Sequence, residues 1–370
     1  SGKPYIIYKS QTGFDLYTNF SKKIVLNNKN IQSFLKKKNK KKMKNTDLYI
    51  GFFGYELLNN LIDIKLPRQK DFNFPKGIFY KPEKKIKLSN NLNHFERDFE
   101  SGSFKININK KSYTKIFNRF KKKIKSGETY QIKICTKYKT KSKIDPLDFF
   151  SRLSKTNLAP EAFMIKDNNY SIVSCSPENL ITKKGSEIST KPIAGTVKKT
   201  KNLNKSKALN YFRKNLKETK EHNMIVDMER NDLSRICKIG TVRLSKQKIV
   251  EEYKDLFHYV SLIKGKLRKN INNVDIIKAM MPGGSVIGCP KINTLNLLNN
   301  QEKENRNIYT GSFGYIKFNG DMRFNIIIRS ILNFKNTSEI SVASGVVVDS
   351  NANHEFNENF LKAKALIDLF

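Results

Sequence analysis

The sequence predicts an α+β fold with a largely antiparallel sheet. Two observations support this class: the predicted strands occur in runs, and regular alternation of strand, helix and strand is absent. A third observation concerns size. The chain has 370 residues, of which 38% are hydrophobic, so it is long enough for one large domain or two small ones with a substantial core.

In the first half of the chain, strands are expected where short apolar runs lie between turn residues. These runs are residues 5–8, 48–55, 129–138, 162–165 and 171–174. Helices are expected at residues 111–126 and 146–155. The Pro-, Asn- and Lys-rich stretch 65–93 is expected to be a connection.

The second half begins with the longest predicted helix, residues 205–235, in which apolar residues keep an approximate helical period. A shorter helix is expected at 273–281, ending at Pro282-Gly-Gly-Ser285. Strands are expected at 309–318, 323–333 and 341–348. A helix over residues 355–369 closes the chain.

The formal net charge of +38 raises the possibility of a nucleic-acid-binding protein, because a basic surface binds phosphate by releasing counterions. However, Lys, Asn and Ile are all abundant, and a compositionally biased genome explains the three together. The basic run Lys36–Lys42 lies in a predicted loop or helix end, and no basic-aromatic recognition motif is present. We therefore expect no functional binding of nucleic acid.

The sequence gives no indication of a membrane protein, because it contains no run of 18 apolar residues. The start at Ser1 shows no signal-peptide pattern and no Met, so a trimmed or incomplete N-terminus is expected. The four cysteines are far apart and form no CxxC motif. This spacing favours a reducing, cytoplasmic location.

Two acidic pairs stand out in a chain that has 71 Lys and Arg but only 33 Asp and Glu. They are Glu218-Thr-Lys-Glu221 and Glu355-Phe-Asn-Glu358, both in predicted helices. At this spacing the two carboxylates of a pair project from one helical face and repel each other. Mg²⁺ would compensate for that repulsion, since it binds carboxylate oxygens and keeps room for water and substrate oxygens. The alternative is two solvated helix faces.

Further motifs occur together and in a fixed order. They are Gly127-Glu-Thr-Tyr-Gln131, Ser174-Cys-Ser-Pro-Glu178, Thr190-Lys-Pro-Ile-Ala-Gly-Thr196, Lys217-Glu-Thr-Lys-Glu221, Pro282-Gly-Gly-Ser285, Tyr309-Thr-Gly-Ser312, Gly345-Val-Val-Val-Asp349 and Glu355-Phe-Asn-Glu358. This series resembles the chorismate-utilising enzymes, which include anthranilate synthase component I, aminodeoxychorismate synthase component I, isochorismate synthase and salicylate synthase. The resemblance covers about residues 95–370 and, more weakly, 1–90.

The resemblance implies the fold of these enzymes, in which two packed, largely antiparallel β-sheets are surrounded by helices and an active-site cleft lies between the halves. It implies that residues 95–370 form the chorismate-binding catalytic domain. We expect residues 1–94 to be a shortened N-terminal region that belongs to the same α+β unit.

The resemblance also implies the roles of individual residues. Glu218, Glu221, Glu355 and Glu358 would surround Mg²⁺, which would clamp one carboxylate of chorismate. Glu178 would be the general acid for the departing hydroxyl, which requires a pKa raised by burial. The remaining expected residues are His258, Gln131 and Thr196 as catalytic groups, and Gly195, Tyr309, Arg329, Ser344, Gly345 and Lys362 as substrate-binding groups.

Gln131 is the most diagnostic single position for the nucleophile. Members of the family that add water are similar in having a Lys there, which can act as a base, whereas the ammonia-using members have Gln. The resemblance therefore implies amination, with ammonia supplied by a separate glutaminase subunit. The chain carries no glutaminase-like nucleophilic Cys motif of its own.

The product is expected to be 4-amino-4-deoxychorismate, for folate synthesis, with anthranilate, for tryptophan synthesis, as the alternative. Ala194 matches anthranilate synthases, because many aminodeoxychorismate synthases carry a nucleophilic Lys at that position. Several other features resemble aminodeoxychorismate synthases more closely: Ser174-Cys-Ser-Pro-Glu178, Gly320-Asp-Met-Arg-Phe-Asn325 and Gly51-Phe-Phe-Gly-Tyr-Glu56. In addition, Ile7-Tyr-Lys-Ser10 replaces the Leu-Leu-Glu-Ser element of tryptophan-inhibited anthranilate synthases.

Two residues depart from the family pattern. Ile287 stands where the family usually has Thr, which removes a hydroxyl near the substrate. Ser344 replaces a Gly at the end of a glycine-rich strand, which would narrow the approach to the ligand.

Overall fold

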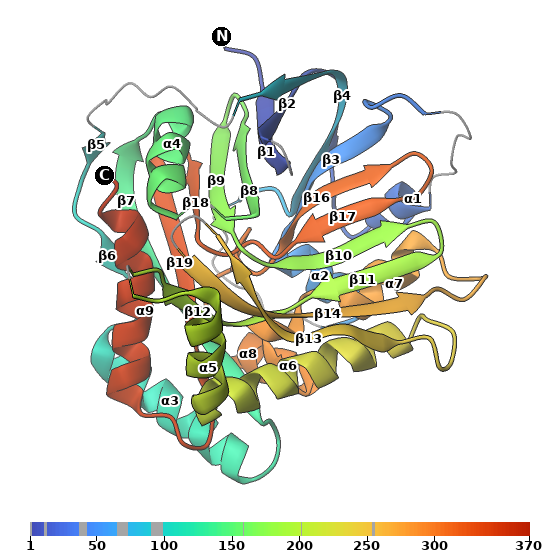
Figure 1. The fold of residues 1–370 in the computed structure, drawn as a ribbon. Helices are drawn as coiled ribbons and strands as arrows, with labels where there is room; N and C mark the ends of the chain where they lie inside the picture. The colour runs from blue at the N-terminus through green and yellow to red at the C-terminus, as the bar shows by residue number, and fades with distance from the viewer. Residues whose placement is uncertain are drawn as a thin grey trace.

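The computed structural model describes residues 2–10, 13–36, 43–64, 73–89, 99–157, 159–200, 202–253 and 256–370 (Figure 1). Its strands are β1 (Tyr5–Ser10), β2 (Gly13–Val25), β3 (Leu48–Phe53), β4 (Gly77–Leu88), β5 (Glu100–Ser101), β6 (Lys105–Ile106), β7 (Gln131–Lys143), β8 (Glu161–Lys166), β9 (Tyr170–Ser176), β10 (Asn179–Lys184), β11 (Glu187–Lys191), β12 (Ile193–Lys198), β13 (Arg243–Glu252), β14 (Leu256–Lys266), β15 (Gly288–Cys289), β16 (Ser312–Lys317), β17 (Met322–Asn325), β18 (Ser330–Phe334) and β19 (Thr337–Val346). Its helices are α1 (Ile31–Leu35), α2 (Tyr55–Leu61), α3 (Lys110–Lys125), α4 (Pro146–Asn157), α5 (Lys205–Lys214), α6 (Leu216–Ser234), α7 (Asn273–Met280), α8 (Lys291–Gln301) and α9 (Ala352–Ile367), with a 3₁₀ turn at Gly284–Val286.

The strands form one continuous antiparallel ladder. Starting from β7, hydrogen-bonded neighbours follow in the order β7, β19, β18, β9, β8, β1, β2, β4, β3, β16, β17, β10, β11 and β14, and β14 also pairs with β12 and β13. The expected antiparallel α+β class is confirmed. The two expected sheets are joined through β1, β2 and β4, so they are two halves of one ladder.

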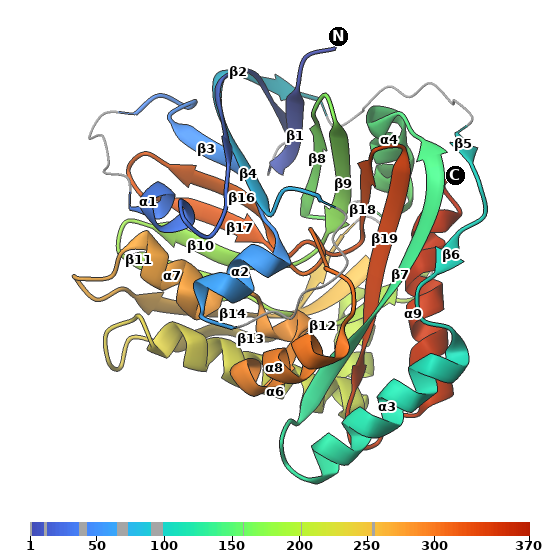
Figure 2. The same cartoon turned by 180° about the vertical axis from the view of Figure 1, so that it is seen from behind.

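Helices cover the outside of this ladder. In Figure 1, α6 runs beneath β13 and β14, while α3 and α9 lie beside β7 and β19. Figure 2 shows α2, α7 and α8 together on the opposite face. The largest apolar cluster lies under these three helices and includes Leu57, Phe79, Ile277 and Leu298. Near the two ends of the ladder, α6 packs against β12 and β14, and α9 packs against β19.

Most expected elements are confirmed, including the helices at 111–126, 146–155 and 273–281 and the closing helix. The single helix expected over 205–235 is wrong, because the chain forms α5 and then α6. Asn215 separates them: it ends α5, and its side chain accepts a hydrogen bond from the Glu218 backbone N–H at 3.2 Å, which caps α6.

Two further expectations were wrong. The single strand expected over 323–333 is divided into β17 and β18, and Arg329 lies in the break with a φ of 50°. These two strands pair with different neighbours, β10 and β9. The stretch 65–93 contains β4, whose Lys81–Lys87 segment is too polar to be recognised as a strand from hydropathy.

The boundary expected at residues 94 and 95 lies outside the described residues, as does most of the basic run Lys36–Lys42. On either side of that boundary the ladder is shared: β1 pairs with β8, and β3 pairs with β16. The four cysteines are all free thiols. Among the described helices, none has the length and apolar character needed to cross a membrane.

Candidate active site

A cavity of about 750 Å³ lies where the two ends of the ladder approach each other. It is lined by residues of β7, β19 and β12, by the connection between β9 and β10, and by side chains of α6 and α9. Seven of the sequence-predicted site residues line it: Glu178, Thr196, Glu221, Tyr309, Arg329, Glu358 and Lys362. This size and mixed lining are typical of small-molecule sites.

Glu178 lies in the short connection between β9 and β10 and is only 6% exposed. Burial raises the pKa of its carboxyl to about 7, and the neighbouring charge of Lys133 opposes that rise only in part. A carboxyl with its pKa raised in this way keeps its proton closer to neutral pH than an exposed glutamate does. Glu178 is therefore suited to donate a proton to a substrate oxygen.

His258 faces Thr196 across the pair β12 and β14, with 2.7 Å between its Nδ1 and Thr196 Oγ1. Burial lowers the pKa of His258 to about 4, and the charge of Arg329 contributes further. The imidazole is thus neutral at neutral pH. His258 does not itself line the cavity, and it reaches the cavity through Thr196.

The two acidic pairs each lie at the start of a capped helix. Glu218 is in the first turn of α6, and Glu355 is in the first turn of α9, where the side chain of Asn351 accepts from two backbone N–H groups. Only the second member of each pair, Glu221 or Glu358, reaches the cavity surface. The first members lie behind that surface. Glu355 is only 1% exposed. Glu218 Oε2 packs against Gly195, since a Cβ added to Gly195 would lie 2.5 Å from it.

The donor set fits a hard divalent cation. Ligand atoms of His354, Glu355 and Glu358 lie within 4.8 Å of one another. Across the cavity, the same two lysines, Lys133 and Lys362, interact electrostatically with both Glu221 and Glu358. The two helices therefore bring carboxylates to one place, and carboxylate oxygens are the ligands that Mg²⁺ takes.

Gln131 and Lys133 both contact Glu221 from β7. Gln131 Nε2 donates to Glu221 Oε1 at 2.8 Å, and Lys133 Nζ donates to the same oxygen at 3.0 Å. The ammonium of Lys133 is the largest influence that lowers the pKa of Glu221 to about 2. Burial alone would lower the pKa of Lys133, but the charge of Glu221 and its hydrogen bond outweigh burial and raise it.

Substrate-binding candidates close the rest of the cavity. Lys362 donates to the Ala343 carbonyl at 3.0 Å and pairs with Glu358 Oε1 at 2.6 Å. Tyr309 is placed by the buried carboxylate of Glu56, which accepts from the backbone N–H groups of Arg306 at 2.6 Å and Asn307 at 3.1 Å. The turn that carries Tyr309 is therefore held by the last residue of the Gly51–Glu56 motif.

Several expected residues do not line the cavity: Gln131, Gly195, Glu218, His258, Ser344, Gly345 and Glu355. Ser344 Oγ points instead to Tyr113 Oη, 2.8 Å away. Gly345 lies against β7: a Cβ on it would be 2.7 Å from Gln131 Nε2 and 2.8 Å from Lys133 Nζ. Ile287 is fully buried, and its carbonyl accepts from the Lys133 N–H at 3.0 Å.

Lys133 is the site residue that sequence reasoning missed. It follows Gln131 by two positions in a strand, and residues at that spacing share a face. That periodicity could have placed Lys133 in the site once Gln131 was placed there.

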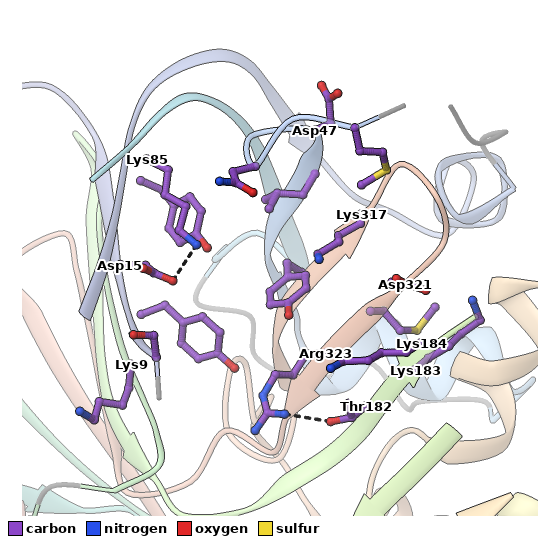
Figure 3. A pocket seen from close by; sticks show the side chains of 18 of the residues that line it. Lys9, Asp15, Asp47, Lys85, Thr182, Lys183, Lys184, Lys317, Asp321 and Arg323 are labelled. Carbon is purple, nitrogen blue, oxygen red and sulfur yellow. Dashed lines mark hydrogen bonds and ion pairs between the residues drawn. The ribbon is translucent and has the colours of Figure 1, made fainter. Parts of the chain in front are cut away.

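A second cavity has a volume of about 950 Å³ (Figure 3). Within the part of the chain that the structure describes, it shares no lining residue with the first. Among the described residues, nine of its 25 lining residues are Lys or Arg, and only three are acidic. Tyr8, Lys9 and Ser10 of the Ile7–Ser10 segment contribute to it. Figure 3 shows the Asp15–Lys85 ion pair and the Arg323–Thr182 hydrogen bond in its wall. Because neither acidic pair reaches it, the smaller cavity is the candidate active site.

The sequence is similar to several known proteins. It is 35% identical over 267 residues to aminodeoxychorismate synthase component 1 of Bacillus subtilis, a match that covers 72% of this chain and 57% of the relative. It is 32% identical over 351 residues to an anthranilate synthase component I-like protein of Synechocystis, covering 86% of this chain and 72% of the relative. Thus the chain spans little more than half of the length of the Bacillus protein.

The fold has close counterparts among solved structures. Anthranilate synthase component I of Streptococcus pneumoniae superposes with a TM-score of 0.79 at 24% identity, covering 98% of this chain and 89% of that one. The isochorismate synthase MenF of Escherichia coli superposes with the same TM-score of 0.79 at 15% identity, covering 99% and 88%. At these identities the comparison establishes the fold alone.

A sequence model of the family described as chorismate binding enzyme matches residues 3–368, which is nearly the whole chain. Together with the relatives and the shared fold, this match establishes what the motifs and the cavity indicated. The chain belongs to the family of chorismate-binding enzymes.

Proposed function

We propose that this protein aminates chorismate in a Mg²⁺-dependent reaction and forms 4-amino-4-deoxychorismate, with ammonia delivered by a glutaminase subunit. The observation that carries the proposal is the Gln131 amide, which donates to Glu221 at 2.8 Å in the candidate active site. An amide cannot remove a proton from water near neutral pH, whereas ammonia needs no such activation. Lys133 does not supply the missing base, because it donates to Glu221 as an ammonium.

The other residues support this chemistry. Glu178, with its pKa of about 7, would protonate the hydroxyl that leaves chorismate. Arg329 and Lys362 would hold carboxylates of the substrate, Arg329 through its planar pair of donors. Glu218, Glu221, Glu355 and Glu358 would hold Mg²⁺, which when bound would neutralise and orient a substrate carboxylate.

Anthranilate synthase is the second candidate. Ala194 favours it, since a nucleophilic Lys is absent from that position. The motifs Ser174–Glu178 and Gly320–Asn325 favour aminodeoxychorismate synthase. Relatives of both names are similar to this chain at comparable identity. We also propose a cytoplasmic location, on the basis of the four free thiols.

Product analysis tests the proposal. The protein is incubated with chorismate, Mg²⁺ and ammonium, and the products are separated by chromatography and identified by mass and fluorescence. We expect 4-amino-4-deoxychorismate, and we expect turnover with glutamine only after a glutaminase subunit is added. Anthranilate and pyruvate as products would select the second candidate. Isochorismate formed without ammonia would reject amination.

A further inference from the structure

Lys133 lies inside the carboxylate cluster, although no motif of the sequence points to it. Its Nζ is 3.0 Å from Glu221 Oε1, and the side chain is 15% exposed. It also interacts electrostatically with Glu358 and Glu178. This ammonium therefore binds one carboxylate of α6 directly and lies within the electrostatic influence of Glu358 on α9 and of the buried Glu178.

The position of this ammonium is tightly defined. Gly345 leaves space for it, because a Cβ there would lie 2.8 Å from Lys133 Nζ. On the other side, Glu221 Oε1 accepts from both Lys133 and Gln131. A carboxylate oxygen has two lone pairs, so these two donors use both of them.

A metal ion bound between the two helices would compete with these two hydrogen bonds for Glu221. Glu221 could offer Oε1 to the metal only if Lys133 or Gln131 gave up its hydrogen bond. A positive charge at Lys133 would also repel a divalent cation beside Glu221 and Glu358. Lys362 also carries a charge near both carboxylates, but it pairs with Glu358 Oε1, at 2.6 Å, whereas Lys133 occupies Glu221 Oε1.

We propose that Lys133 is an internal cation that balances the carboxylate cluster when the metal is absent and competes with Mg²⁺ for Glu221. This inference rests on the proposed metal site. It assigns Lys133 two measurable effects: it stabilises the metal-free protein, and it weakens Mg²⁺ binding. Mg²⁺ binding and metal-free stability are therefore linked through one side chain.

Titration calorimetry of Mg²⁺ into the metal-free protein, without substrate, measures the first effect. Lys133→Met removes the charge but keeps an unbranched side chain, and Lys133→Gln removes the charge but keeps a donor for Glu221. We expect both variants to bind Mg²⁺ at least about tenfold more tightly, which is about 1.4 kcal/mol. Lys198→Met is the matched control, because Lys198 lines the same cavity and, within the described part of the chain, forms no hydrogen bond or ion pair with either acidic pair. It should leave Mg²⁺ affinity within about twofold.

Thermal unfolding in EDTA measures the second effect. We expect Lys133→Met to unfold at a lower temperature than the unmodified protein in EDTA, and to gain more from added Mg²⁺. Equal or weaker Mg²⁺ affinity in both Lys133 variants would overturn the inference while leaving the metal site intact. Absence of Mg²⁺ binding in the unmodified protein and in every variant would refute the metal site itself, and with it the inference.

Discussion

Gln131 and Glu221 are joined by a hydrogen bond of 2.8 Å between the amide Nε2 and the carboxylate Oε1. The bond connects β7, near one end of the strand ladder, to α6, which packs on β12 and β14 near the other end. It also fixes the amide as a donor toward Glu221. The choice of nucleophile is therefore tied to the carboxylate cluster.

We predict that Gln131→Lys gains measurable isochorismate formation from chorismate and water. The new ammonium would share Glu221 with Lys133, and two like charges at one carboxylate depress the pKa of one of them, which creates a base. Product analysis by mass spectrometry checks this. Gln131→Met is the control and should form none. Equal isochorismate from the unmodified protein would contradict the prediction.

Glu178 sets the pH dependence of the proposed reaction. Its pKa is raised to about 7, so the proton-donating form is present below that pH and is lost above it. We expect kcat/KM, expressed per concentration of un-ionised ammonia, to fall as pH rises through about 7. Glu178→Gln should lower the rate roughly 10²- to 10⁴-fold at all pH values and should abolish the fall in kcat/KM as pH rises through about 7. A pH profile that is unchanged in the variant would exclude Glu178 as the acid.

Substitution of Gly345 should reduce activity more than stability. A Cβ there would lie 2.7 Å from Gln131 Nε2 and 2.8 Å from Lys133 Nζ, which are the ends of side chains and not backbone atoms. We expect Gly345→Ala to fold, with only the modest loss of stability that weaker contacts of Lys133 and Gln131 with Glu221 imply, and to lose about tenfold or more in kcat/KM.

Gly314→Ala is the contrasting variant. Its Cβ would lie 1.9 Å from the backbone carbonyl oxygen of Arg323, which cannot move without disturbing the β16–β17 pair. We expect it to lose thermal stability strongly, as measured by circular dichroism. Similar stability in Gly314→Ala and Gly345→Ala would contradict this distinction.

Arg323 and Glu161 form an ion pair in which the carboxylate is 1% exposed and also accepts from Tyr8 Oη at 2.6 Å. Removing one partner leaves a buried charge without its counterion. We expect Arg323→Met to reduce the free energy of unfolding by about 2–4 kcal/mol, measured in urea. The double variant with Glu161→Gln should recover part of that loss. Additive losses would show that the two residues are not coupled.

The basic surface gives a last prediction. If the net charge of +38 reflects composition alone, the protein should bind DNA weakly, and binding should vanish between about 50 and 200 mM salt in a gel-shift assay. Sequence-selective binding that survives at higher salt would instead identify a nucleic-acid function.

Half of the site residues predicted from the sequence line the candidate cavity, because the motifs carry residue types whose chemistry is recognisable in isolation. The sequence predicted the acidic pairs and Glu178, and the structure brings Glu221, Glu358 and Glu178 to one cavity. It could not predict that Asn215 divides a helix, because the choice between continuing a helix and capping a new one depends on tertiary packing. It also missed Lys133, since lysines are too common in this chain for one of them to stand out.

The break between β17 and β18 at Arg329 could not be predicted from the sequence either. The run Phe324–Ile328 is apolar enough for a buried strand, but β17 and β18 pair with different neighbours, so the backbone must turn between them. That turn gives Arg329 its φ of 50°, and Arg329 lines the cavity there. The hydropathy of a segment indicates whether it is buried, but it does not indicate with which neighbouring strand the segment pairs.

The strand ladder has one more consequence, which concerns mechanics. Gln131 lies on β7 and Thr196 lies on β12, near opposite ends of the ladder. The distance between these two strands therefore depends on the summed twist of all the strand pairs on the path between them. The contacts of Glu221 with β7 close this path into a ring. Substitutions in any strand of this ring can therefore alter the width of the cavity, even when they lie far from it. The hydrogen bonds of Glu221 with β7 limit how far the two ends can separate.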